Sequence, residues 1–455
     1  MGSIRKISGL AGPFRMPNTH PSVFDVREMK LFENAPLWLD RAVVALITVF
    51  VFVIPFHFNT ATQEISFYTA LGIAIGLIAF RKKPFSLKSP LSLPFALFVA
   101  WTFIGLFFAL NRSNSIHDFY GHLVKYILLF YLIVTFFGTR ERFLLLVRTF
   151  IISTSLFAAG LMIYFYLIQG NPLSARLLDV KIPVNILSVV LIFPVVLAAN
   201  ESFRAKRLGV RALLLLSISV IATAVFLTGS RYSAAVLLLS LVALTVNHRK
   251  RAVFLILIIA AAVAFFPVKS RLLTGDLADS VKKDPRLFLS KPFIEMIKDH
   301  PATGIGFGMD TYANKRLVKR YNAKLDPDSR LDERWLSSFY YPHNIYVDVA
   351  ARTGIVGLLI FFYLAFSYFR AGWAITRNSG DDFLRRWSIC LMIAFFALLV
   401  IGVFESYLGF TISVVLYIQC AMMVILWRLH LREPAASNGI QAQPAFSRSA
   451  AAKTG

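Results

Sequence analysis

Long apolar segments alternate with short polar connections along most of the chain. Twelve such segments, of about 16 to 26 residues, lie at 42–58, 65–80, 91–110, 122–137, 143–168, 183–199, 212–229, 233–247, 252–267, 344–369, 387–404 and 411–427. A helix of about 20 apolar residues spans the hydrocarbon core of a bilayer. The pattern therefore predicts an all-α polytopic membrane protein with about 12 transmembrane helices.

One polar stretch, Val268 to His343, is much longer than the other connections. It holds fourteen Lys or Arg and ten Asp or Glu, whereas most other connections have about five to fifteen residues. In a membrane protein, one long loop among short ones usually carries a water-facing site. We expect the chain to divide into a cytoplasmic N-terminal segment (1–41), helices 1–9 (42–267), the large loop (268–343), helices 10–12 (344–432) and a disordered cytoplasmic tail (433–455).

Lys and Arg are distributed unequally between the two sets of connections that alternate along the chain. One set, which includes both termini, holds 28 of the 48 basic residues. The other set, without the long loop, holds only Arg112, Lys125, Arg176, Lys181, Arg231 and Arg352. Because cytoplasmic loops collect Lys and Arg, both termini are predicted in the cytoplasm and the long loop outside it. Long loops are exempt from this bias, so the basic residues of the loop itself do not contradict the assignment.

Composition agrees with a membrane protein, with 57% apolar residues and a net charge of +24. Such a charge in a soluble protein would suggest nucleic acid, but cytoplasmic loops explain it here and no recognition motif accompanies it. Cys390 and Cys420 lie inside apolar segments and define no disulfide framework. We therefore expect membrane lipids around the protein and no nucleic-acid partner.

Arg231 is a candidate binding residue, because it lies in Thr228-Gly229-Ser230-Arg231-Tyr232 at the turn between two apolar segments. An ionised group at that depth is costly and usually faces a cavity or a partner. A planar guanidinium suits phosphate oxygens, so one reading is contact with an anionic lipid-linked substrate. The alternative is that Arg231 extends to lipid headgroups at the membrane interface.

Two further features lie in the long loop. Arg286 follows Asp284-Pro285, and an arginine in a polar loop is most often a solvated surface residue. The run Gly304, Gly306 and Gly308 does not have the spacing of a dinucleotide-binding motif, and no strand precedes it. It predicts a tight turn, in which glycines take positive φ or permit close backbone approach.

His343 ends the loop, directly after Pro342 and before an apolar segment. Histidine has an unperturbed pKa of about 6.5 and is suited to moving protons at neutral pH, although a single histidine at a membrane boundary is often structural. Asp348 and Arg352 are four residues apart, acid first, so they should pair on one helical face. No second His, Cys or carboxylate stands at metal-ligand spacing, so no metal site is expected.

Two more charged residues belong to the same side of the predicted membrane. Lys125 lies in the outer part of an apolar segment and could meet a phosphate, although a lysine that extends to the interface is the simpler reading. Glu405 lies in the short turn between the last two helices, where a solvated helix cap is the default expectation.

Taken together, Thr228 to Tyr232, Arg286 to Gly308, and Tyr341-Pro342-His343-Asn344 through Leu358 resemble the O-antigen ligase superfamily. This superfamily also includes polysaccharide polymerases and some protein O-glycosyltransferases. The resemblance covers about 130 residues of the second half of the chain, together with the layout of many helices and one large late loop.

The resemblance implies a GT-C-like membrane glycosyltransferase that needs no metal and no cofactor. It would take a glycan from undecaprenyl pyrophosphate at the periplasmic face of the bacterial inner membrane and join it to a sugar hydroxyl. The catalytic histidine of the family corresponds to His343, and its phosphate-binding arginines correspond to Arg231 and Arg286. Many relatives carry an acid where this chain has Arg352, and Asp348 is the nearest local substitute.

Three functions follow from this pattern. The preferred one is an O-antigen ligase whose acceptor is the lipid A core, with inversion at the anomeric carbon. The second is a polymerase of the same superfamily, whose acceptor is another lipid-linked repeat unit. The third is a transporter of lipid-linked oligosaccharides, which would need charged residues along a path through the bilayer, whereas the ionisable residues here gather at the outer end.

Overall fold

The structure is a computed structural model that describes residues 37–56, 59–179, 184–245, 288–312, 314–333, 336, 341–406, 408 and 413–433. Every regular element within these ranges is a helix. The predicted apolar segment 252–267, Arg286 and both chain ends (1–36 and 434–455) lie outside the described residues.

Helices occupy eleven of the twelve predicted apolar segments. They are α2 (Leu37–Val53), α3 (Thr60–Ala79), α4 (Ser92–Gly105), α6 (Lys125–Phe136), α7 (Arg140–Met162), α8 (Val184–Ser202), α9 (Leu208–Leu227), α10 (Arg231–Thr245), α19 (Ile345–Asn378), α20 (Asp382–Gly402) and α21 (Val414–Leu431). Seven helical runs in the described part of the chain are long and apolar enough to cross a membrane. The chain is thus a multi-pass, all-helical membrane protein, while twelve crossings and a GT-C-like arrangement stay predictions.

One helical run begins earlier than its apolar pattern. The helix α5 (Arg112–Asp118), the π-helix η1 (Phe119–Val124) and α6 follow one another without a break. Asn111 caps the run, because its side chain accepts a hydrogen bond from the Asn114 amide. The predicted segment 122–137 missed the first two turns because α5 is polar. Short π-helical turns inside α-helices are frequent at functional sites.

One end of the bundle, here the Asp40 end, collects charged residues from loops that the sequence assigns to the cytoplasm. Lys83 Nζ lies 2.5 Å from Asp40 Oδ1, and Arg142 pairs with the other oxygen of the same carboxylate. Arg140 pairs with Asp381, which caps α20. These loops, far apart in sequence, thus meet at one end as the charge pattern predicts, and the compartment that they face remains a prediction.

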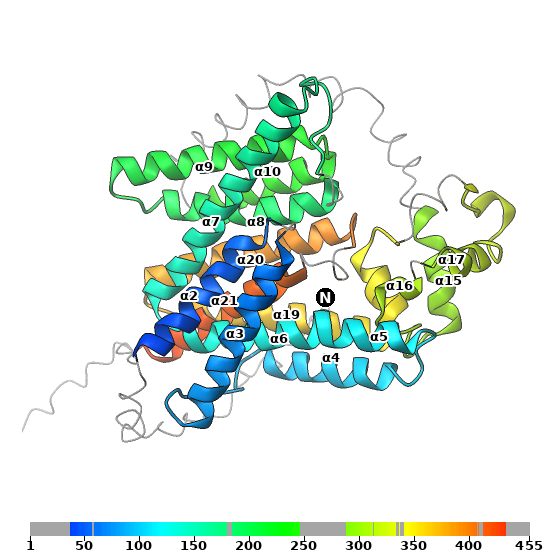
Figure 1. Ribbon diagram of the computed structural model, residues 1–455, viewed down its shortest axis with the longest axis horizontal. Helices are drawn as coiled ribbons and strands as arrows, with labels where there is room; N and C mark the ends of the chain where they lie inside the picture. Colours follow the sequence, from blue (N-terminus) through cyan, green and yellow to red (C-terminus); the bar gives the residue numbers. More distant parts are fainter. Residues whose placement is uncertain are drawn as a thin grey trace, which may run out of the picture.

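The described part of the long polar stretch is itself folded. It contains α15 (Lys291–Asp299), α16 (Met309–Tyr312), α17 (Lys315–Asn322) and the short 3-10 turn η3 (Pro327–Ser329). These helices pack around a small apolar cluster that also includes Ala351 of α19. Its other members include Leu289, Phe293, Met296, Val318, Tyr321 and Leu331. Figure 1 shows these helices gathered at one side of the bundle, beyond α5 and away from α7 and α9. We call the end of the bundle next to them the His343 end.

Candidate functional site

His343 lies buried directly before α19, with 4% of its surface exposed. Its backbone has φ +49°, a conformation that is uncommon for residues other than glycine and that clusters at functional sites. The next residue, Asn344, caps α19 through hydrogen bonds from the Tyr346 and Val347 amides to its side-chain oxygen. The imidazole packs against the Tyr341 ring, with 4.2 Å between centroids. Asn344 therefore fixes the backbone that follows His343, and Tyr341 fixes the position of its ring.

Glu405 is the partner of this imidazole. His343 Nδ1 lies 3.1 Å from Glu405 Oε1, and the same oxygen accepts a hydrogen bond from the Ser406 amide at 3.2 Å. Glu405 is fully buried, so the expectation of a solvated cap is wrong. The cause is tertiary: the turn after α20 folds inward onto the start of α19. A carboxylate at Nδ1 favours the tautomer with its proton on Nδ1 and the basic lone pair on Nε2.

A buried ion pair lies one turn further along α19. Asp348 and Arg352 are both buried, and Arg352 Nη1 lies 3.9 Å from Asp348 Oδ1, which confirms the predicted pairing. The Ser406 hydroxyl donates a hydrogen bond to the other oxygen of Asp348. Ser406 therefore touches both carboxylates, since its amide contacts Glu405 and its hydroxyl contacts Asp348.

Arg352 also joins α19 to the glycine-rich part of the long loop. Its Nε donates to the Phe307 carbonyl at 2.7 Å, and its guanidinium lies over the Phe307 ring at 4.1 Å from the centroid. A buried guanidinium needs such partners, because an uncompensated charge in the interior is costly. Arg352 is thus a buried cation that binds both an acid of its own helix and the loop backbone.

The glycine-rich segment is inserted into a break in α19. The helix is interrupted at Gly354, whose φ of 73° and ψ of 178° are not helical. A broken helix leaves carbonyl groups without helical partners, and here the loop supplies them. Ile305 N–H donates to Ala351 O at 2.9 Å and Gly306 N–H to Arg352 O at 3.3 Å.

Glycine is required on both sides of this contact. A Cβ on Gly354 would lie 1.8 Å from the Ala302 carbonyl oxygen, and a Cβ on Gly304 would lie 2.5 Å from the Arg352 carbonyl carbon. Gly304 and Gly306 have φ of 68° and 112°. The prediction that these glycines take positive φ and permit close backbone approach is therefore confirmed.

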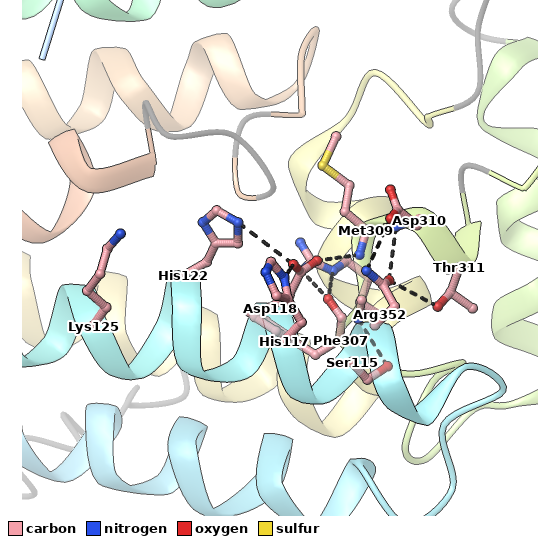
Figure 2. Close-up of polar contacts among 12 residues, drawn as sticks. Ser115, His117, Asp118, His122, Lys125, Phe307, Met309, Asp310, Thr311 and Arg352 are labelled. Carbon is pink, nitrogen blue, oxygen red and sulfur yellow. Dashed lines mark hydrogen bonds and ion pairs between the residues drawn. The ribbon is translucent and has the colours of Figure 1, made fainter. Parts of the chain in front are cut away.

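The α5–η1 run holds the other side of the same segment. Ser115 Oγ accepts from the Gly308 amide at 3.2 Å, and Asp118 Oδ2 accepts from the Met309 amide at 2.7 Å. His117 Nδ1 lies 3.0 Å from the Asp118 carboxylate, and Figure 2 shows Asp118 among these residues and beside Arg352. Sequence reasoning treated this segment as a connection and missed Asp118. The sequence did contain a signal for it, because an acid at the start of an apolar helix is costly and usually has a partner.

The turn before α10 reaches the same end of the bundle. The Tyr232 ring stacks on Phe404 with 3.9 Å between centroids, and Phe404 directly precedes Glu405. Arg231, one residue before Tyr232, is exposed at the start of α10. The structure therefore brings the turn that carries Arg231 to the segment that carries the partner of His343.

A second arginine lies at this turn. Arg176 Nε donates to Thr228 O at 3.0 Å, and its Nη2 donates to Gly229 O at 3.2 Å. These carbonyls follow the end of α9, so Arg176 fixes the turn from which Arg231 projects. Sequence reasoning gave Arg176 no role, because its partners are more than fifty residues away.

Lys125 is already engaged by an acid. Its ammonium lies 2.5 Å from Glu64 Oε1, and 12% of the side chain is exposed. In Figure 2 it points to the same side of the helix as His122. Among the residues that the structure describes, no group of three or more His, Cys, Asp or Glu is placed to hold a metal ion.

Comparison with protein families matches residues 212–362 to a family described as O-Antigen ligase. The matched range contains Arg231, the inserted glycine segment, His343 and the helix break at Gly354. No match was found among curated proteins.

Proposed function

From the match of residues 212–362 to a family described as O-Antigen ligase, we propose that the chain is an O-antigen ligase. It transfers a glycan from undecaprenyl pyrophosphate to a sugar hydroxyl of the lipid A core, at the periplasmic face of the bacterial inner membrane. The observation that carries the proposal is the buried pair of His343 and Glu405, which has the geometry of a general base and the group that orients it.

His343 acts as the base. A sugar hydroxyl is a weak nucleophile, and its oxygen attacks the anomeric carbon of the donor while Nε2 takes its proton. The bond between the anomeric carbon and the pyrophosphate oxygen breaks, and its electron pair leaves with the pyrophosphate. A single displacement of this kind inverts the anomeric centre. Positioned general bases contribute about 10²- to 10⁴-fold in rate.

Glu405 acts through His343. When the imidazole accepts the proton it becomes a cation, and the carboxylate 3.1 Å from Nδ1 stabilises that charge where water is excluded. Ser406 holds the carboxylate in place through its amide, and Asp348 binds the Ser406 hydroxyl. Asp348 is thus proposed as a positioning residue rather than a group that touches the reacting atoms.

The leaving group needs positive charge rather than a proton. Arg231 is proposed to bind the pyrophosphate at the start of α10, where helix amides add to the positive potential. Arg176 holds that turn in place. Arg286 is proposed as the second phosphate-binding arginine on the sequence resemblance alone, because it lies outside the described residues. Lys125 is neutralised by Glu64, so any phosphate contact at Lys125 would require that pair to open.

The function is tested by deleting the protein and separating surface glycans on a gel. A ligase defect leaves long polymer on the carrier lipid and bare acceptor. A polymerase defect instead leaves single repeat units, and that result would replace the ligase with the polymerase of the same superfamily. Normal glycan on the acceptor in the deletion strain would contradict both.

A further inference from the structure

Helix α17 concentrates positive charge that the proposed mechanism does not use. Its eight residues, Lys315 to Asn322, include Lys315, Arg316, Lys319 and Arg320 and no acid. All four basic residues are exposed. The described stretch 288–333 as a whole has seven acidic and eight basic residues, so the excess on α17 reflects segregation rather than composition. We call these four residues the α17 basic face.

The helix that carries this face is firmly held. We call the folded part of the long polar stretch, residues 288–333, the loop domain. Val318 and Tyr321 are buried in its apolar cluster. Asn322 Nδ2 donates to Leu331 O at 3.1 Å, and its Oδ1 accepts from the Leu331 amide at 2.8 Å. Asn314 caps the first turn by accepting from the Arg316 amide at 2.9 Å. The basic side chains therefore point outward from a fixed helix.

The basic residues of this face are spaced so that they repel one another along the helix. Lys315 and Lys319 are four residues apart, as are Arg316 and Arg320, and like charges at that spacing destabilise a helix. Lys319 has an exposed partner in Glu333. Arg316 and Arg320 have no acidic partner among the residues that the structure describes. An external anion would relieve this repulsion.

Two other basic residues of the same domain are paired with acids. Lys298 Nζ lies 2.6 Å from Glu295, and Lys324 Nζ lies 2.5 Å from Asp299. Hydrogen bonding from Lys324 lowers the pKa of Asp299. The domain can therefore place acids beside its cations, and the absence of acids from α17 itself is specific to that helix.

We propose that the α17 basic face binds the phosphate-bearing core oligosaccharide of the acceptor glycolipid. This inference rests on the proposed ligase function. Two guanidinium groups one helical turn apart can each form paired hydrogen bonds with phosphate oxygens. In Figure 1, α17 lies beyond α5 and α16, set off from the long helices of the bundle. Its exposed basic side chains are therefore open to a ligand from outside the bundle.

The face is also coupled to the candidate site. α16 begins at Met309 and α17 follows it, and the amides of Gly308 and Met309 are anchored to Ser115 and Asp118. The segment just before them binds Arg352 on α19. An oligosaccharide held on α17 is therefore held by the segment that fixes the helix following His343, which restricts where its acceptor hydroxyl can lie.

The test compares Arg316→Gln/Arg320→Gln with wild type. Glutamine retains helix propensity and removes the two charges. Lys298→Gln is the matched control, because it neutralises an exposed residue of the same domain. Titrations of purified full-length protein with released core oligosaccharide, intact or enzymatically dephosphorylated, give the dissociation constants without requiring turnover.

We expect the double variant to bind the intact oligosaccharide about fivefold more weakly. This factor is what the loss of two exposed ion pairs, each with a small contribution to affinity, would produce. The control should bind like wild type, and the dephosphorylated oligosaccharide should not distinguish the three proteins. The weakening should also shrink as salt is raised. Equal affinity of the double variant and wild type for the intact oligosaccharide overturns the inference.

Vesicles of phosphatidylglycerol, which contain no glycan, test the other source of anionic groups. If the double variant loses binding to these vesicles but not to the oligosaccharide, the face binds the bilayer and the inference is wrong. Transfer assays on the same proteins separate the two claims. Failure of the wild-type protein to transfer glycan contradicts the ligase proposal. The role of α17 is decided separately, by the affinities of the wild type and the double variant for the intact oligosaccharide.

Discussion

Glu405→Gln removes one negative charge beside His343 and preserves the shape of the side chain. The carboxylate is fully buried and lies 3.1 Å from Nδ1, so no solvent screens the contact. A hydrogen bond to a charged group is worth about 1 to 2 kcal/mol more than a neutral one, which corresponds to about 5- to 30-fold in rate. We therefore expect kcat to fall by that factor while the KM for donor is unchanged.

The assay is initial-rate and single-turnover transfer in proteoliposomes, with thermal unfolding in detergent measured on the same proteins. If Glu405 acts on the transfer step, the variant should transfer glycan more slowly while its unfolding temperature and its KM for donor stay at the wild-type values. A merely structural role for Glu405 would instead lower the unfolding temperature together with the rate.

The chain supplies a matched control for this variant. At the Asp40 end, His430 Nδ1 lies 2.8 Å from Glu433 Oε2, so Glu433→Gln removes the same kind of pair far from the candidate site. The control should transfer glycan at the wild-type rate. If Glu405→Gln retains the wild-type rate, the assignment of Glu405 to His343 is wrong.

Three further predictions follow from the site. Gly354→Ala should lower the free energy of unfolding by at least about 1 to 3 kcal/mol, because Gly354 has φ 73° and its new Cβ would meet the Ala302 carbonyl; thermal unfolding in detergent measures this. Asp118→Ala should speed hydrogen exchange at the Met309 amide by about tenfold or more, since it leaves a partly buried donor without its acceptor. Arg231→Lys should raise the KM for donor by about tenfold in initial-rate assays, because an ammonium cannot form the paired contact with phosphate.

Controls for these variants come from positions with similar chemistry and open surroundings. Gly160→Ala lies within α7 with no atom within 4 Å of the new Cβ, so it should not lower the unfolding temperature. Asp310→Ala removes an exposed acid of the same segment and should leave exchange at Met309 unchanged. A wild-type KM for donor in Arg231→Lys would exclude the bidentate contact.

Local patterns in the sequence predicted the helices well. Apolar length alone located eleven helices, because a segment that crosses a bilayer must satisfy its backbone internally. The i,i+4 spacing predicted the Asp348–Arg352 pair, and the spacing of Gly304 and Gly306 predicted a close backbone contact. Each of these features depends on residues that are near one another in the chain.

Contacts between distant segments could not be predicted in this way. Glu405 is 62 residues from His343, and only the inward fold of the turn after α20 buries it. The break in α19 at Gly354 was hidden, because a single glycine inside an apolar segment is usually tolerated in a helix. Asp118 and Arg176 were passed over for the same reason, since their partners are loop backbones far along the chain.

The central claim, that His343 takes the proton from the acceptor hydroxyl, is tested most directly with His343→Asn. Asparagine accepts positive φ better than most residues, so the backbone at this position can be kept. We predict that donor binding, measured separately, is retained while the single-turnover transfer rate falls by about 10²-fold or more. A folded, donor-binding variant that transfers glycan at the wild-type rate would contradict the account.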